Sequence, residues 1–269
     1  DLVKKRTVTP EVAAFLWLAV DGYGVKPANI LISGGTSSGK TTTLNVLTSL
    51  IPERERIITI EDTAELSLPV EHWIRFETRP PGLEGTGEID MDTLVKNSLR
   101  MRPDRIIVGE VRHAEAFTLF TAMNTGHDGC MGTVHANSAE ETVARLLNPP
   151  MNVPPLMLGA LDFVVVEQKL HDRRKGTIRR ITEVAEFEGF SEGKPQLQVL
   201  YQWDAVNDTM KRTGVPSRYL RDLMKFTGLS RGDLEKEILK RKAFIEELYK
   251  RDIVRLSDVT EAIRSFRES

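Results

Sequence analysis

The sequence predicts an α/β protein built on a mostly parallel sheet, and two features of the chain lead to this prediction. Short apolar segments of strand length alternate with segments of helical length from residue 30 to residue 167. Parallel strands buried between two layers of helices are typically continuous apolar runs rather than alternating patterns. In addition, the apolar run Ile30–Ile32 leads directly into a glycine-rich loop and then into a helical segment, as at a phosphate-binding edge of such a sheet.

Start and stop signals delimit the elements of this α/β part. The first helix begins with Thr9 as N-cap and Pro10 at the first helical position, and it ends at Asp21–Gly24. Pro103 stops a later helix. Helices are expected at residues 10–20, 41–50, 91–101, 114–124 and 139–147, strands at 30–32, 57–60, 73–77 (an edge strand), 105–110, 130–135 and 161–167, and a flexible loop at 79–87.

The pattern changes in the C-terminal part of the chain. Residues 178–187 and 197–203 alternate polar and apolar side chains on either side of a turn, which predicts a β-hairpin. After residue 207 the sequence looks helical, with three serines at expected helix starts: Ser217, Ser230 and Ser257. We therefore expect an α/β domain over residues 1–207, containing the hairpin 178–203, and a helical subdomain over residues 208–269.

Composition narrows the class of protein. With 269 residues, 40% of them apolar and 28% charged, the chain has the length and composition of a globular protein with one large or two modest domains. Its formal net charge of −2 gives no sign of a polyanionic partner. Cys130 is the only cysteine, so no internal disulfide and no cysteine metal site is possible. The sequence shows no signal peptide and no apolar run of transmembrane length. Because it begins at Asp1 without Met, we expect a fragment whose N-terminal part is missing.

A phosphate-binding loop follows the first strand. Gly34, Gly39, Lys40 and Thr41 match the pattern G-x-x-x-x-G-K-[ST] between a strand and a helix. The glycines let successive backbone N–H groups point at one phosphate, and the N-terminus of the helix adds positive potential. We expect Lys40 to reach the β- and γ-phosphates of ATP and the Thr41 hydroxyl to bind Mg²⁺. The expected nucleotide-binding residues are Gly34, Gly35, Thr36, Ser37, Ser38, Gly39, Lys40, Thr41 and Thr42.

Carboxylates stand at the ends of two expected strands. Glu61, Asp62 and Glu65 follow the second strand, and Glu110 closes the strand that begins at Arg105. Nucleotide hydrolysis needs a held Mg²⁺ ion and an aligned water, and acids at the carboxyl ends of strands beside the loop are suited to both tasks. Glu110 is therefore a candidate for organising Mg²⁺ and Glu65 for activating water. The alternatives are a solvated strand end for Glu110 and a helix cap formed by Asp62, which is compatible with a catalytic Glu65.

His135 ends the fourth strand, where it could donate a hydrogen bond to the γ-phosphate or serve as a structural residue. The other histidines show no metal-ligand spacing with it, which argues against zinc chemistry.

Seven candidate arginines lie in the same half of the chain as these motifs. Some of them could neutralise phosphates, in cis or across a subunit interface as arginine fingers, and others are ordinary surface residues. They are Arg75, Arg79, Arg100, Arg102, Arg105, Arg112 and Arg145.

Four segments in this order resemble the Walker A, Asp box, atypical Walker B and His box motifs of the type II/type IV secretion ATPase superfamily. They are Gly34–Thr41, Thr59–Glu65, Ser98–Arg112 and Gly132–Ser138. Two further segments, Glu77–Pro81 and Asn124–Gly129, resemble the archaeal branch of motors for secretion, pili and archaella. The resemblance covers residues 9–203.

The resemblance implies a RecA-like ATPase core that works as a homo-hexamer in the cytoplasm, peripheral to the inner face of a membrane. Such motors use ATP and Mg²⁺ to secrete proteins or to assemble pilus- or archaellum-type filaments. By motif position, Glu65 resembles the general base or water-orienting residue and Glu110 the Walker B acid. His135 resembles the His-box residue, and Arg75 or Arg79 the arginines near the Asp box. The resemblance also implies an N-terminal domain ahead of this core, and its absence puts full activity and hexamer formation in doubt. Docking of the helical tail to a membrane platform protein is one idea for its role.

Two other functions remain open at this level. A hexameric motor that translocates nucleic acid would need a basic surface, for which Lys169–Arg174, Arg179 and Arg180 are the local candidates against a near-neutral chain. A nucleotide-gated scaffold that binds ATP with little turnover is the second alternative. The complete set of acids argues against it for the whole protein, but missing partner residues keep it open for a fragment.

Overall fold

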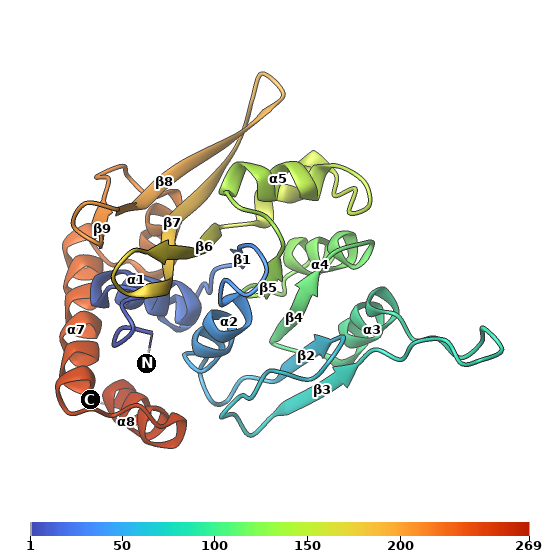
Figure 1. Cartoon of the computed structure of the whole chain (residues 1–269), viewed down its shortest axis with the longest axis horizontal. Coiled ribbons are helices and arrows are strands. Elements are labelled where there is room, and N and C mark those ends of the chain that lie inside the picture. Colours follow the sequence, from blue (N-terminus) through green and yellow to red (C-terminus); the bar gives the residue numbers. More distant parts are fainter. Residues whose placement is uncertain (1, 269) are drawn as a thin grey trace.

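A nine-stranded sheet with helices on both faces forms the body of the molecule (Figure 1), as the computed structural model shows for residues 2–268. The strand order is β3-β2-β4-β5-β1-β6-β7-β8-β9. The first six strands in this order are parallel, and the last three are antiparallel. The strands are β1 (Ile30–Ser33), β2 (Ile57–Glu61), β3 (Trp73–Glu77), β4 (Arg105–Val111), β5 (Met131–Val134), β6 (Phe163–Asp172), β7 (Gly176–Ser191), β8 (Lys194–Asp204) and β9 (Thr209–Arg212).

The helices divide between the two faces of the sheet and form two hydrophobic clusters. Side chains of α1, α2, α6 and α7 share one cluster with one face of the sheet, and side chains of α3, α4 and α5 share the other. The helices are α1 (Pro10–Asp21), α2 (Lys40–Thr48), α3 (Met91–Ser98), α4 (Glu115–Asn124), α5 (Ala139–Leu147), α6 (Arg218–Thr227), α7 (Arg231–Lys250) and α8 (Leu256–Glu268). Short 3₁₀ turns lie at Gly22–Gly24, Leu99–Met101 and Pro155–Ala160.

The residues that the sequence predicted at helix ends form the expected capping contacts. The Thr9 side chain accepts from the backbone N–H of Val12 at the start of α1, and Gly22 ends that helix in the left-handed conformation. The side chains of Ser230 and Asp233 form the expected capping box of α7. The edge strand β3 is confirmed as well.

The sheet differs from the prediction in the lengths of its strands and in their number. The hairpin strands β7 and β8 both extend beyond the predicted ranges 178–187 and 197–203. β6 runs to Asp172, five residues beyond the predicted end, because its polar C-terminal half pairs with β7 as an antiparallel ribbon outside the buried sheet. β9 extends the sheet beyond residue 207, and its four half-buried or exposed residues carry no apolar pattern that would have predicted it. The division into a domain over residues 1–207 and a subdomain over 208–269 stays a prediction.

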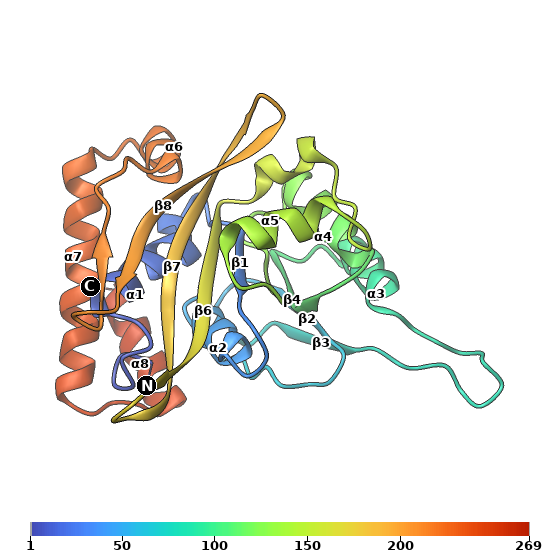
Figure 2. The ribbon, with the colours of Figure 1, turned by 45° about the horizontal axis from the view of Figure 1, so that its top comes forward.

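An extended arm, residues 78–90, joins β3 to α3 and projects away from the body in both views (Figures 1 and 2). Two backbone hydrogen bonds between Arg79 and Ile89 close its base, and the Arg79 Nε donates to the carbonyl oxygen of Gly87 at 2.7 Å. Leu83 at the far end is fully exposed.

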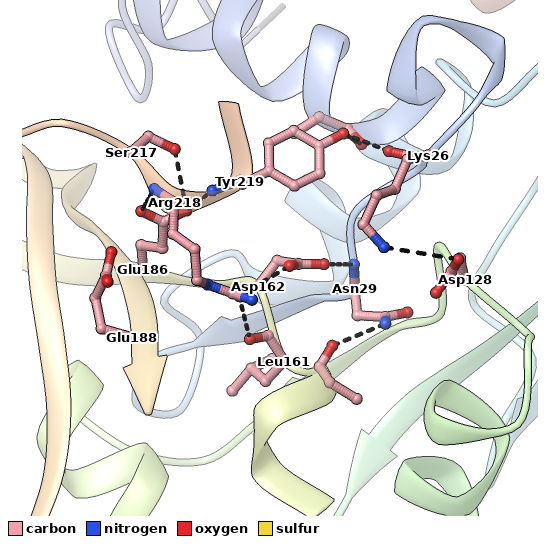
Figure 3. A network of polar contacts seen from close by, with 12 residues as sticks. Lys26, Asn29, Asp128, Leu161, Asp162, Glu186, Glu188, Ser217, Arg218 and Tyr219 are labelled. Atoms are coloured by element: carbon pink, nitrogen blue, oxygen red, sulfur yellow. Dashed lines mark hydrogen bonds and ion pairs between the residues drawn. The ribbon is translucent and has the colours of Figure 1, made fainter. Parts of the chain in front are cut away.

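A buried polar network anchors α6 to the sheet (Figure 3). The carboxylate of Glu186 on β7 accepts from the Ser217 hydroxyl at 3.0 Å and from the backbone N–H groups of Arg218 and Tyr219 at 2.8 and 2.6 Å. The Arg218 guanidinium donates to Asp162 at 3.0 Å. Burial raises the pKa of Asp162 to about 6 and that of Glu186 to about 7. Helix α6 is therefore joined to the sheet by hydrogen bonds that take the place of water around two buried carboxyl groups.

None of the helices within residues 2–268 combines the length and the apolar character that a membrane span requires.

Candidate nucleotide site

The phosphate loop stands where the sequence predicted it, between the carboxyl end of β1 and the start of α2. Ser37 and Gly39 have positive φ angles of 60° and 115°, so the loop curls tightly before the helix begins. No side chain caps α2, which leaves its first backbone N–H groups available to an anion. Lys40 Nζ donates to the carbonyl oxygens of Gly34 and Gly35 at 2.8 and 2.9 Å, and burial lowers the pKa of Lys40. The loop is thus built for a phosphate group.

A cavity adjoins the loop on the side of the antiparallel strands. The N-terminal segment contributes Lys5 and Thr7 to its wall, and β7 contributes Arg179. The expected nucleotide-binding residues that line it are Ser37, Ser38, Gly39, Lys40, Thr41 and Thr42. The part of a nucleotide beyond a phosphate bound at the loop would extend into this cavity, which is lined by polar and apolar residues in similar measure.

The predicted acids meet at a second cavity, on the other side of Thr41. Glu65 and Glu110 line it together with Glu61 and Asp62. The structure contradicts the alternative of a cap formed by Asp62. Asp62 does not cap the turn after β2, because the side chain of Glu61 accepts from the backbone N–H groups of Glu65 and Leu66 at 2.9 and 3.0 Å. Asp62 accepts instead from the Thr78 hydroxyl at 3.1 Å.

Arg112 forms ion pairs with two of these acids. Its guanidinium donates to Glu110 and, at 3.3 Å, to Asp62. The carboxylate of Glu110 raises the pKa of Arg112 above its usual value. The cavity therefore holds a positive charge between two carboxylates, beside the hydroxyl of Thr41.

The donor set of this cavity fits Mg²⁺. Within residues 2–268 no cluster of three His, Cys, Asp or Glu side chains could hold a metal ion by itself. Mg²⁺ typically binds through one or two protein oxygens, several waters and the phosphates of its nucleotide. The Thr41 hydroxyl and the Glu110 carboxylate, which face one cavity at the end of the phosphate loop, match that requirement.

The residues after β5 lie against the phosphate loop, because β5 pairs directly with β1. The backbone N–H of Gly34 donates to the carbonyl oxygen of Val134 at 3.3 Å, and the Ser33 hydroxyl donates to the carbonyl oxygen of Ala136 at 3.0 Å. A Cβ atom on Gly35 would lie 3.4 Å from the side-chain oxygen of Asn137. His135 is half-buried within this segment, beside the loop-bearing strand.

The arginines Arg75 and Arg79 lie apart from the loop. Arg75 is on the edge strand β3, which β2, β4 and β5 separate from β1, and its guanidinium lies 4.6 Å from the ring centroid of Trp73. Arg79 is engaged within the arm through Gly87. Neither residue lines the two cavities described above, but Arg79 lines a further cavity together with Glu110 and Arg112.

Asn137, Glu167 and Arg179 lie at the site without having been predicted as nucleotide-site residues, and Arg112 was predicted only as one of seven candidate arginines. Arg112 and Asn137 lie inside the resembling motifs, so their position was a usable signal. Glu167 had a weaker signal, since it ends the predicted strand beside β1. Arg179 had none, because it reaches the loop only through the long antiparallel pairing of β6 with β7.

A phosphate loop between a parallel strand and a helix, with acids at the ends of neighbouring strands, defines a nucleotide-binding protein of the RecA-like α/β class. The chain belongs to the type II/IV secretion system protein family, whose family model matches residues 24–209. It therefore carries the ATPase domain of that family, and the predicted family and fold class are confirmed.

The chain is similar to curated relatives and to a solved structure. Two uncharacterized proteins of Methanocaldococcus jannaschii are 30% and 36% identical to the chain, over 99% and 93% of its length. The chain spans 61% of the first of these relatives and 91% of the second. The crystal structure of the VirB11 ATPase from the Brucella suis type IV secretion system, in complex with sulphate, is 32% identical with a TM-score of 0.53. That match covers 64% of this chain and 52% of the VirB11 chain.

Proposed function

We propose that this chain is the ATP-hydrolysing core of a motor for protein secretion or for assembly of a pilus- or archaellum-type filament. One observation carries the proposal. Thr41, at the start of the helix behind the phosphate loop, faces the same cavity as the strand-end acids Glu65 and Glu110. A hydrolytic site needs this combination of phosphate binding, metal binding and water activation.

Each residue has a stated role in the proposal. Lys40 exchanges its bonds to the loop carbonyls for the β- and γ-phosphates of ATP. Thr41 and Glu110 would hold Mg²⁺, which would neutralise charge on the phosphates. Glu65 orients the attacking water, and its backbone is fixed for this purpose by Glu61. His135 donates to the γ-phosphate.

Completion of the site by a neighbouring subunit is part of the proposal. Arg75 and Arg79 are on the edge strand and on the arm, where a second copy of the chain could approach them. They would act as arginine fingers in a homo-hexamer. We place the motor in the cytoplasm at the inner face of a membrane, where it would bind a membrane platform protein.

Translocation of nucleic acid receives less support. Two residues of the candidate basic patch are already engaged within the chain, since Arg180 is buried and forms an ion pair with Asp208 while Arg179 donates to the loop at Ser37. A scaffold with little turnover remains the alternative that the experiment below tests.

The test measures ATP turnover against protein concentration, with mass determined in parallel and Mg²⁺ present. Turnover per subunit that rises as a hexamer forms supports catalysis completed across the interface.

Glu65→Gln should lower turnover roughly 10²- to 10⁴-fold and leave ADP affinity unchanged, as for loss of a catalytic base. Lys40→Ala should weaken ADP binding, and Glu71→Gln, an exposed residue outside both cavities, should behave as wild type. Normal turnover of Glu65→Gln would remove Glu65 from the mechanism. A monomer that binds ATP with low, constant turnover would favour the scaffold.

A further inference from the structure

Glu167 is a buried acid that lies against the phosphate loop and has no role in the mechanism above. It follows Val166, the last residue of β6 that pairs with β1, and its side chain is 1% exposed. Its Oε2 accepts from the hydroxyl of Thr43 on α2 at 2.7 Å. The strand beside the loop is thereby joined to the helix that follows the loop.

Both signature glycines of the loop, Gly34 and Gly39, lie against Glu167. A Cβ atom on Gly34 would lie 2.2 Å from the backbone oxygen of Glu167, and a Cβ atom on Gly39 would lie 2.4 Å from its Oε1. The backbone contact excludes a side chain at position 34, whereas a side chain at position 39 would be strained by the φ of 115° and would displace the carboxyl group of Glu167. The two ends of the loop are therefore held against Glu167, through its backbone at one end and its carboxyl group at the other.

Two cations face the carboxyl group. Lys40 approaches from α2, and Arg179 approaches from β7, where its Nε donates to the carbonyl oxygen of Ser37 at 2.9 Å. Both cations and the Thr43 hydroxyl favour the charged carboxylate. Burial opposes them and is the larger effect, so the pKa of Glu167 is raised to about 7.

We propose that Glu167 is a positioning residue of the nucleotide site. Glu167 fixes the phosphate loop against α2, and its buried negative charge lowers the affinity of the loop for the phosphates of a nucleotide. The inference rests on the proposed nucleotide site. A bound phosphate chain brings negative charge to the loop and engages Lys40, which leaves the carboxylate with less compensation. Nucleotide binding is then accompanied by uptake of a proton from solvent onto Glu167 near neutral pH.

The test compares the affinity for ADP with Mg²⁺ at pH 6 and pH 8 in wild type and Glu167→Gln. Gln keeps an acceptor for Thr43 and cannot become charged. If the nucleotide raises the pKa of Glu167 by one unit, Glu167→Gln should bind ADP roughly five- to tenfold more tightly than wild type at pH 8. At pH 6 the two proteins should agree within about twofold, because wild-type Glu167 is then protonated. Titration of the nucleotide itself affects both proteins equally.

Glu183→Gln is the matched control. Burial also raises the pKa of Glu183 to about 7, but its like-charged neighbour is Glu140 on α5 rather than a residue of the loop. Since Glu183 pairs with Val166, its side chain lies on the opposite face of the sheet from that of Glu167. Its substitution should leave ADP affinity unchanged at both pH values.

Thr43→Val keeps the inference testable if Glu167→Gln does not fold. Loss of the hydroxyl removes a group that favours the carboxylate, so Glu167 should remain protonated to higher pH and ADP should bind more tightly than in wild type at pH 8. Equal or weaker binding by Glu167→Gln at pH 8, or the same gain in Glu183→Gln, would overturn the inference. Wild type that does not bind ADP at all would instead overturn the proposed function.

Discussion

Replacement of Arg105 by Met should destabilise the protein strongly without changing its nucleotide site. Arg105 begins β4, the strand that carries Glu110 at its other end, and its side chain is only 1% exposed. Its guanidinium donates twice to Glu55 and, at 2.6 Å, to the carbonyl oxygen of Val20. Removal of one partner from a buried ion pair costs about 3–5 kcal/mol, and we take about 3 kcal/mol because Glu55 is partly exposed. For a chain of this size that corresponds to a fall in Tm of roughly 6–12 °C.

A neighbouring pair supplies the matched control. Arg264 pairs with Glu53, two residues before Glu55, but the Arg264 side chain is 56% exposed. Exposed pairs contribute little, so Arg264→Met should leave Tm almost unchanged. The assay is thermal unfolding of both variants, with ADP affinity measured at a temperature where both are folded. Equal shifts in Tm would refute the argument from burial, and weaker ADP binding by folded Arg105→Met would refute the separation of stability from function.

Two further predictions concern the loop and the buried acids. Gly39→Ala should abolish ADP binding in a folded protein, because φ at Gly39 is 115° and the added Cβ would meet Glu167. Gly35→Ala should still bind ADP, because the nearest atom to its added Cβ lies 3.4 Å away. Equal ADP binding by both variants would contradict the strained geometry. Thermal stability of wild type should fall as the pH rises from 5 to 7.5. The folded-state pKa values of Asp162 and Glu186, about 6 and 7, lie above the ordinary values of 3.8 and 4.5. Groups of this kind contribute full stability below their unfolded pKa and lose it as the pH rises through the folded pKa. Glu186→Gln should reduce this slope, whatever its absolute Tm, and an unchanged slope would assign the pH dependence to other groups.

Much of the fold and of the phosphate site could be read from local patterns. The loop Gly34–Thr41 consists of glycines, a lysine and a threonine at fixed spacing, so its presence can be recognised from its own residues. The caps at Thr9 and Ser230 are equally local. The acids Glu65 and Glu110 were placed together because carboxyl ends of parallel strands meet at one edge of a sheet.

Side-chain direction was harder to predict at the same edge. The sequence offered Asp62, a good N-cap residue, as an alternative cap after β2, while the structure uses Glu61. Glu61 ends the strand with its side chain buried, and its longer reach brings the carboxylate back to two N–H groups of the following turn. Propensity describes a residue type, whereas this contact depends on which way the strand points its last side chain.

Local chemistry along the chain therefore determined that this protein has a phosphate loop, strand-end acids and an α/β sheet to carry them. Tertiary structure alone brings Glu167 to Thr43, 124 residues away, and Arg179 to Ser37, 142 residues away. These contacts arise from strand order and register, which set neighbours that no local pattern encodes. The loop can be recognised from its own residues, but the charge that surrounds it comes from the strands that the fold places beside it.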